Sequence, residues 1–490
     1  MNTPFLIGID MGTTNAKAIA CDKAGNLLAT HSVGYSVQYP QPDWAEQDPD
    51  EIVAAALECI HKVYSTTKSY GPLLGISFSS AMHSLVALTE QGQPLTKLII
   101  WADNRSADIA DALRPTAIGK EMYRRNGTPI HAMTPACKLR WLHEHQPVVF
   151  RRAAKFVGIK EYLFYKLTGK YLIDYSVASA TGLFNIRELR WDAWTLDQLR
   201  LEISQLSEPV SPFHVQELPS SEVLSLPAGT PLVIGASDGC LANLGSGATD
   251  PGTMAITIGT SGAARISAPR AYSDDQMRTF CYLLEEQTYI IGGATNNGAI
   301  IFQWLKDTFF ANETYEQVFA RAEAIEPGAD GLVFLPYLLG ERAPLWDSHV
   351  RGGFAGLGIR HTQAHFVRAV MEGIILNLYS IGKILMEQQP IHTVYANGGF
   401  TQSTTWVQLL ADVFGKPIAL NETAETGAMG AMMMGLKALG HIREYDEVPQ
   451  FTPVARTVEP NWMRHRGYQL LAARFEQWVK TVTREYPSTL

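Results

Sequence analysis

The sequence predicts an α/β protein of two similar domains, each a mixed sheet flanked by helices, with a cleft between them. One observation is that an apolar run ending in glycine and threonine occurs twice, at residues 5–14 and 254–261. Another is that strand-like runs and then helical periodicity follow each copy, an order typical of mixed sheets with helices on both faces. The 490 residues, 46% hydrophobic and 18% charged, suffice for two cores.

The first half begins with a predicted buried strand at 5–10 that ends in a Gly-Thr-Thr turn. Its other elements are separated by turn residues: predicted strands at 16–21, 27–37, 76–83 (ending in polar residues), 98–100 and 232–235, and a helix at 49–64. Residues 245–252, Gly-Ser-Gly-Ala-Thr-Asp-Pro-Gly, break any regular element. We therefore expect an N-terminal domain at 1–247 and a C-terminal domain at 248–490.

The second half repeats the order of the first. The predicted elements are strands at 254–258, 262–266, 288–293 and 393–397, and helices at 299–309, 405–414 and 464–485. The last helix carries apolar residues at helical spacing, and we expect it only to pack against the core.

The two Gly/Thr turns are candidate phosphate loops. Glycine permits positive φ and lets backbone N–H groups approach an anion, and Thr13, Thr14, Thr260 and Ser261 add hydroxyl donors. A single turn of this kind is more often only a hairpin tip. Two copies in one chain favour a site that holds phosphates from both sides.

Asp10 and Asp238 each follow an apolar run and precede small residues. Phosphoryl transfer needs positioning, charge neutralisation and an acceptor for the proton of the attacking hydroxyl. Asp10, beside the first turn, is the Mg²⁺ candidate, and Asp238 is the candidate general base and a second metal candidate. The alternative for Asp238 is that it only caps the following helix.

Two longer segments resemble a known family. Residues 133–145 read Met-Thr-Pro-Ala-Cys-Lys-Leu-Arg-Trp-Leu-His-Glu-His, and residues 352–372 run from Gly-Gly-Phe-Ala-Gly to His-Phe-Val-Arg-Ala-Val-Met-Glu. The chain resembles the FGGY carbohydrate kinases, in the superfamily of actin, hexokinase and heat-shock chaperone ATPases. The resemblance implies two ribonuclease H-like domains, with ATP and Mg²⁺ as cofactors. Within the segments, Trp141 and Phe354 are expected mainly to pack.

The resemblance also implies a set of nucleotide-binding residues. Around the phosphates these are Gly12, Thr13, Thr14, Lys17, Gly259, Thr260 and Ser261; beneath and beside the adenosine they are Gly398, Gly399 and Gln402. A helix at 426–432 would support the adenosine wall. The alternative for Gly398 and Gly399 is a plain strand-to-helix turn.

For the sugar, the resemblance implies His83, Trp101, Asp103, Arg105, Asp238 and Asn297. Each has a structural alternative: a histidine at a strand end is more often a satisfied core residue, and Asp103 with Arg105 could form an ion pair. The wording at 79–84, Ser-Ser-Ala-Met-His-Ser, is similar to the branch that phosphorylates gluconate to 6-phosphogluconate, whereas xylulose kinases usually show Gly-Gln-Met-His-Gly. An arginine fork such as Arg105 could grip the gluconate carboxylate.

Other functions remain alternatives: a xylulose kinase, or a sugar-sensing or chaperone-like ATPase without catalysis. The net charge of −8 and the absence of Lys/Arg runs longer than a pair argue against nucleic acid and anionic membranes as partners. Five cysteines without C-x-x-C spacing suggest neither zinc nor disulfides. We expect a cytoplasmic enzyme, a monomer or homodimer, acting on a small sugar or sugar acid.

Overall fold

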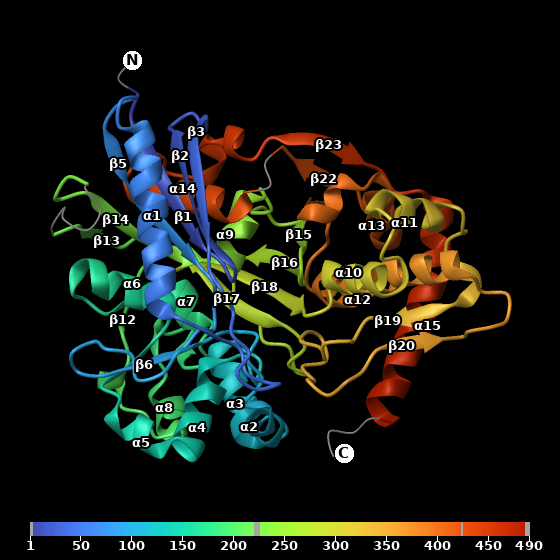
Figure 1. Ribbon diagram of the computed structural model, residues 1–490, viewed down its shortest axis with the longest axis horizontal. Coiled ribbons are helices and arrows are strands. Elements are labelled where there is room, and N and C mark those ends of the chain that lie inside the picture. Colours follow the sequence, from blue (N-terminus) through green and yellow to red (C-terminus); the bar gives the residue numbers. More distant parts are fainter. Residues whose placement is uncertain (1–2, 220–225, 423–424, 486–490) are drawn as a thin grey trace.

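A computed structural model describes residues 3–219, 226–422 and 425–485. Its two mixed sheets lie side by side, with helices between them and on their outer faces (Figure 1). The fold is thus the two-domain α/β architecture that the sequence predicts.

The first sheet has the order β13-β14-β5-β1-β2-β3. The central strand β1 (Phe5–Met11) pairs antiparallel with β2 (Asn15–Asp22), and β2 pairs antiparallel with β3 (Leu27–Gly34). On its other side β5 (Leu73–Ser80) and β14 (Pro231–Ser237) run parallel to it, and β13 (Val215–Glu217) closes the edge. The parallel strands end at the same edge of the sheet, so Asp10 near the end of β1 and Asp238 after β14 lie on that edge.

The second sheet has the order β17-β18-β16-β15-β21-β22-β23. Its strands are β15 (Thr253–Ile258), β16 (Gly262–Ala268), β17 (Phe280–Glu285), β18 (Thr288–Thr295), β21 (Thr393–Asn397), β22 (Ile418–Asn421) and β23 (Val454–Val458). Strand β15 pairs antiparallel with β16 and parallel with β21, as β1 does with β2 and β5. The expected duplication is therefore present in strand order and direction.

Helices cover both faces of each sheet. The helices α1 (Pro49–Thr67) and α6 (Ile159–Thr168) pack on the outer face of the first sheet, and α12 (Gln363–Gln388), α13 (Thr404–Phe414), α10 (Ala299–Phe309) and α15 (Trp462–Glu485) pack around the second. In the described parts of the chain, α12 alone has the length and apolar character of a membrane span, and 83% of its apolar window is buried inside the protein.

Two helices, α9 (Asp238–Gly245) and α14 (Thr426–Ala438), lie between the sheets (Figure 1). Glycines allow the close packing: a Cβ on Gly430 would lie 2.0 Å from the carbonyl oxygen of Leu241 in α9, and one on Gly435 would lie 2.6 Å from a methyl of Leu6 in β1. The helix expected at 426–432 as an adenosine wall therefore packs on the first sheet. Its first turn lies beside Asp10, at Gly427, and its expected support of the adenosine wall stays a prediction.

The remaining elements are short and lie mostly in an insertion between β5 and β14 or around the second sheet. They are β4 (Glu46–Gln47), β6 (Val86–Leu88), β7 (Leu98–Ile99), α2 (Ala107–Leu113), α3 (Ala117–Asn126), α4 (Pro135–His145), α5 (Pro147–Arg152), β8 (Lys155–Val157), β9 (Leu172–Asp174), α7 (Tyr175–Ser179), β10 (Phe184–Asn185), β11 (Arg190–Trp191), α8 (Ala193–Leu199), β12 (Glu208–Val210), α11 (Tyr315–Glu323), β19 (Val333–Leu335) and β20 (Gly353–Ala355).

Strand β17 joins the two halves at one end. The backbone N–H of Cys281 donates to the carbonyl of Gly127 at 2.8 Å, and the N–H of Leu283 donates to Ser179 Oγ at 3.0 Å. The hydroxyl of Tyr123 donates to the carbonyl of Thr279 at 2.8 Å. The edge strand of the second sheet is thereby attached to the insertion of the first half.

Candidate active site

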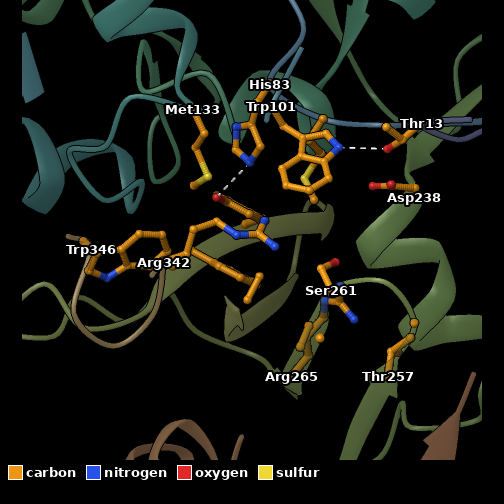
Figure 2. A pocket seen from close by; sticks show the side chains of 17 residues that line it. Thr13, His83, Trp101, Met133, Asp238, Thr257, Ser261, Arg265, Arg342 and Trp346 are labelled. Atoms are coloured by element: carbon orange, nitrogen blue, oxygen red, sulfur yellow. Dashed lines mark hydrogen bonds between the residues drawn. The ribbon is translucent and has the colours of Figure 1, made fainter. Parts of the chain in front are cut away.

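A cavity of about 200 Å³ lies where the two halves meet (Figure 2). The first half contributes Thr13, Met82, His83, Trp101, Met133 and Asp238 to its wall, and the second half contributes Thr257, Gly259, Ser261, Gly262, Ala263, Arg265, Phe280, Tyr282, Ala294, Arg342 and Trp346. The site thus depends on both sheets.

Asp238 begins α9 directly after β14, and its side chain faces the cavity (Figure 2). The backbone N–H of Gly239 donates to Asp238 Oδ1 at 2.6 Å. Burial, and after it the charge of Asp10, raise the pKa of Asp238 to about 6 against the opposing charge of Arg265. A carboxylate with this pKa is ionised at neutral pH and more basic than an ordinary aspartate, which suits a proton acceptor.

Asp10 lies near the end of β1, where Ser79 Oγ donates to Asp10 Oδ1 at 2.6 Å. Burial and the charge of Glu425 raise the pKa of Asp10, whereas the Ser79 hydrogen bond lowers it. A Cβ on Gly427 of α14 would lie 2.7 Å from Asp10 Oδ2. Glycine at this position therefore keeps the space beside the carboxylate open.

Whether the surroundings of Asp10 suit Mg²⁺ is judged from the carboxylates available as ligands. Among the described residues no three His, Cys, Asp or Glu side chains gather into a metal cluster. Mg²⁺ in kinases is bound by one or two carboxylates, with water and substrate phosphates completing the octahedron. Asp10 with Asp238, two carboxylates close enough for one to raise the pKa of the other, fits that pattern.

His83 has a left-handed backbone conformation, with φ of 67°. Its Nδ1 donates to the carbonyl oxygen of Ala180 at 2.8 Å, because that oxygen can only accept. Nε2 is then left as an acceptor and lies 3.5 Å from the hydroxyl of Tyr282 (Figure 2). Burial lowers the pKa of His83 to about 3, so the ring is neutral and presents an acceptor to the cavity.

Trp101 forms one wall of the cavity and connects it to the first turn. Its indole Nε1 donates to Thr13 Oγ1 at 2.8 Å (Figure 2). The hydroxyl of Thr13 keeps its own hydrogen, so it can still donate to a ligand. The guanidinium of Arg342 lies over the indole at 4.7 Å from the ring centroid.

Asp103 and Arg105 do not line the cavity. The Arg105 guanidinium donates to both Asp103 oxygens, at 2.8 and 2.7 Å, and to Glu46 at 2.7 Å. It also lies 3.7 Å from the ring centroid of Trp44, and its side chain is only 3% exposed. The two residues form the structural ion pair that the sequence left open as an alternative, and the expectation that they contact the substrate does not match their position.

Asn297 is also absent from the cavity wall. Its Nδ2 donates to the carbonyl of Gly340 at 2.7 Å, and its Oδ1 accepts from the N–H of Leu339 at 3.2 Å. Asn297 thus fixes the loop that carries Arg342.

Sequence reasoning overlooked Arg265 and Arg342 as site residues. Arg265 occupies β16, whose other residues, Gly-Ala-Ala before it and Ile-Ser-Ala after it, are small or apolar. A single charge inside such a strand was the available signal, because a buried strand tolerates an arginine only where it faces a polar site. Arg342 lies in the segment Gly-Glu-Arg-Ala-Pro-Leu-Trp at 340–346, where no periodicity indicated its orientation.

The two Gly/Thr turns occupy corresponding places in the two sheets, but their hydrogen bonds differ in span. The N–H of Gly12 donates to the carbonyl of Asn15, three residues on, at 3.0 Å, and the N–H of Gly259 donates to that of Ser261, two residues on, at 2.9 Å. At the tips Thr14 and Thr260 are both exposed, and Gly259 and Ser261 line the cavity.

Lys17, on β2, makes a salt bridge with Glu425 at 2.7 Å. Its ammonium therefore already has a carboxylate partner just before α14.

Gly398 and Gly399 follow β21 next to the second turn. Gly398 has φ of 112°, and a Cβ there would lie 2.2 Å from the carbonyl oxygen of Ile258, so only glycine fits. A Cβ on Gly399 would meet no atom within 4 Å, which leaves open backbone for a ligand. Gln402 is exposed at the end of the short helix at Gly399–Gln402.

The duplicated fold, the paired hairpin turns and two carboxylates at strand ends define a phosphotransferase of the actin and hexokinase type. Sequence models of the FGGY family of carbohydrate kinases match residues 5–245 with the N-terminal domain and 254–439 with the C-terminal domain. The chain belongs to the FGGY family of carbohydrate kinases. It is therefore an ATP-dependent sugar kinase.

Similar proteins within this family include kinases of gluconate and of xylulose. The chain is 39% identical to a gluconokinase of Bacillus licheniformis, covering 99% of this chain and 97% of that protein. Its structure resembles a gluconate kinase of Lactobacillus acidophilus with a TM-score of 0.95 and 35% identity, covering 99% of each chain. It resembles a xylulose kinase of the same organism equally well, with a TM-score of 0.95, 36% identity and 99% coverage of each.

Proposed function

We propose that this protein is an ATP-dependent gluconate kinase that transfers the γ-phosphoryl group to the terminal hydroxyl of D-gluconate and forms 6-phosphogluconate. The observation that carries the proposal is a cavity that holds both a basic carboxylate, Asp238, and two arginines, the half-buried Arg265 and the buried Arg342. A site with two cations suits a substrate that brings a carboxylate in addition to the phosphates of ATP. Similarity to gluconokinases over nearly the whole chain supports the same substrate.

Asp238 accepts the proton of the attacking hydroxyl as the bond to phosphorus forms. Its carboxylate oxygens are free of side-chain partners among the described residues and face the cavity. His83 Nε2 accepts a hydrogen bond from a sugar hydroxyl, and Trp101 provides an apolar wall. The donors of both turns, Gly12 to Thr14 and Gly259 to Ser261, hold the phosphates between the two halves.

Asp10, with Asp238 opposite, would hold Mg²⁺. When bound, the ion neutralises charge on the β- and γ-phosphates of ATP. The adenosine would lie against the open backbone at Gly398 and Gly399, beside Gln402. The role of Lys17 in this proposal is structural: its salt bridge with Glu425 fixes the start of α14 near Asp10.

A xylulose kinase is the second candidate, because the structural similarity to that Lactobacillus acidophilus enzyme is as high. We further propose a cytoplasmic monomer or homodimer that binds neither nucleic acid nor membranes. The net charge of −8 and the five buried, unpaired cysteines support this.

A coupled assay of ADP release with D-gluconate, D-xylulose and a series of polyols tests the function. We expect D-gluconate to give the highest kcat/KM and the product to carry phosphate on C6, measured by ³¹P NMR. A higher kcat/KM for D-xylulose would assign the chain to the second candidate. ADP release that does not depend on added sugar would contradict a sugar kinase.

A further inference from the structure

Arg265 and Arg342 lie in the cavity wall, the first half-buried and the second buried, and neither has a salt-bridge partner among the described residues. Arg342 is 8% exposed, and neither guanidinium lies within 4.0 Å of a carboxylate oxygen in the described residues. The Nε atoms of both side chains lack a hydrogen-bond acceptor. A buried cation without a counterion is costly, so such a pair indicates anionic ligands.

The neighbour of Arg342 in sequence does not supply the missing charge. Glu341 is fully buried, and its carboxylate accepts from Thr295 Oγ1 at 2.6 Å, from Asn377 Nδ2 at 2.6 Å and from the N–H of Asn296 at 3.0 Å. The guanidinium of Arg342 instead donates to the carbonyl of Thr295 at 2.9 Å through Nη2. Glu341 therefore holds the loop in place, and Arg342 remains available to a ligand.

The two arginines serve different ends of the cavity. Arg265 is close to the start of α9, since a Cβ on Gly239 would lie 3.3 Å from its Nη2. Asp238 is its strongest charged influence, whereas Glu341 and Tyr282 act more strongly on Arg342. Arg342 lies over Trp101, on the side of His83 and Met133 (Figure 2). Arg265 thus lies next to the reacting hydroxyl and phosphate, and Arg342 lies next to the end of the sugar that is remote from the reacting hydroxyl.

We propose that Arg342 binds the C1 carboxylate of the aldonate substrate and sets the preference for a sugar acid over a neutral sugar. This inference rests on the proposed function. A neutral polyol leaves the guanidinium without its counterion, and a site built for a charged group rejects a ligand that lacks it. The burial that holds Arg342 between Trp101 and Thr295 also fixes the direction from which the carboxylate approaches.

The test compares D-gluconate with D-glucitol, which has a hydroxymethyl group in place of the carboxylate. Arg342→Gln should raise KM for D-gluconate roughly 10- to 100-fold and leave kcat/KM for D-glucitol nearly unchanged. Arg265→Gln should instead lower kcat on both substrates. Arg351→Gln, an exposed arginine nine residues further along, is the matched control and should behave like the wild type. Equal losses on both substrates in Arg342→Gln would overturn the inference.

Binding of D-gluconate by calorimetry separates this inference from the proposed function. If the wild type binds D-gluconate and Arg342→Gln does not, the role of Arg342 stands even where turnover of another sugar is faster. If both proteins bind it equally, or if the wild type does not bind it, the inference is wrong. Arg342→Lys keeps the positive charge but loses the bidentate geometry of the guanidinium, and it is a second control for a folded site. The affinity of each variant for ATP also checks that the fold is intact.

Discussion

Asp238 combines a partly buried position with a carboxylate neighbour, and both raise its pKa. The consequence for catalysis depends on which form is active. A base must be ionised to accept a proton, so the active fraction of enzyme rises with pH through the pKa of Asp238.

We therefore expect kcat/KM to increase from pH 5 to pH 7 with a midpoint near 6, and to level off above. Asp238→Asn should reduce kcat by about two to four orders of magnitude at every pH. Asparagine can still accept the hydrogen bond from Gly239, so this variant keeps the local cap. An active Asp238→Asn enzyme would make Asp238 a helix cap only.

The same shift predicts a gain in stability for the inactive variant. The pKa of Asp238 is higher in the folded protein than its ordinary value of 3.8, so the folded state binds the proton more tightly. Ionisation therefore costs stability, a cost that is absent below pH 3.8 and complete above about pH 6. Asp238→Asn should raise the free energy of unfolding at pH 7 by ~1–3 kcal/mol.

Urea denaturation at pH 7 and pH 4 measures this difference. The gain should shrink toward zero at the lower pH. A gain that is the same at both values would have a cause other than the charge of Asp238.

The residues also show where prediction from sequence stops. Asp10 and Asp238 could be proposed from the sequence because each follows its own buried strand, a local signal, and the structure places both at one edge of the first sheet. Arg105 also follows a strand, yet its position is decided by Trp44 and Glu46, more than fifty residues earlier in the chain. Arg342 reaches the cavity through a loop whose course depends on Asn297 and Glu341, and no pattern in the sequence encodes that course.

Among the elements, α4 carries a side chain that ties together the two loops of the sugar side. Lys138 is fully buried, and its Nζ donates to the carbonyls of His83 at 2.6 Å and Ile100 at 2.8 Å, with Ile99 at 3.3 Å. These carbonyls lie at His83 itself and immediately before Trp101. Burial lowers the pKa of Lys138 to about 7.

Lys138→Met should therefore leave the buried His83 carbonyl without its hydrogen bond and release both loops from each other, whereas the carbonyls of Ile99 and Ile100 still accept from backbone N–H groups. We expect the free energy of unfolding to fall by ~2–4 kcal/mol. KM for the sugar should rise, while the affinity for ATP, which we propose to bind at the two Gly/Thr turns, should stay within about twofold. Lys120→Met, an exposed lysine of α3, is the control. A loss of ATP affinity equal to the loss for sugar would indicate general unfolding.

The positions of the strands, unlike the contacts of the site side chains, were largely predictable from the sequence. Hairpins with glycine turns and apolar runs are local signals, and β1 to β3, β15, β16 and β18 follow them closely. The sequence did not predict β17, because its pairing partner β18 follows through a two-residue turn that polar flanking residues obscure. The packing of α14 between the sheets was not predicted, because it depends on contacts with β1, which lies at the other end of the chain.

At the scale of the whole molecule, both halves line one cavity and are attached to each other through β17. The hydrogen bonds at Gly127, Ser179 and Tyr123 fix that end. The turn tips at Thr14 and Thr260 are exposed, and no such hydrogen bond joins them in the described residues. The halves are also in contact through α14, which packs on β1, and through the Lys17–Glu425 salt bridge. Closure around a ligand would therefore move the two turns toward each other about both attachments, β17 and α14.

We expect a smaller radius of gyration, measured by small-angle X-ray scattering, when D-gluconate and a non-hydrolysable ATP analogue are both bound. Either ligand alone should give a smaller change, because each half binds only part of the pair. Identical scattering in all states would show that the site is rigid and already formed.

The packing of α14 has a consequence for how the protein is made. The face of β1 that carries Leu6 and Gly8 is covered by Met432 and Gly435, so on the ribosome it stays bare long after the first sheet has been synthesised. From the end of α9 at Gly245 to the start of α14 at Thr426, translation at ~5–20 residues per second takes roughly 10–40 s. During that time the nascent chain exposes an apolar surface, and we expect chaperone binding to protect it most in this interval.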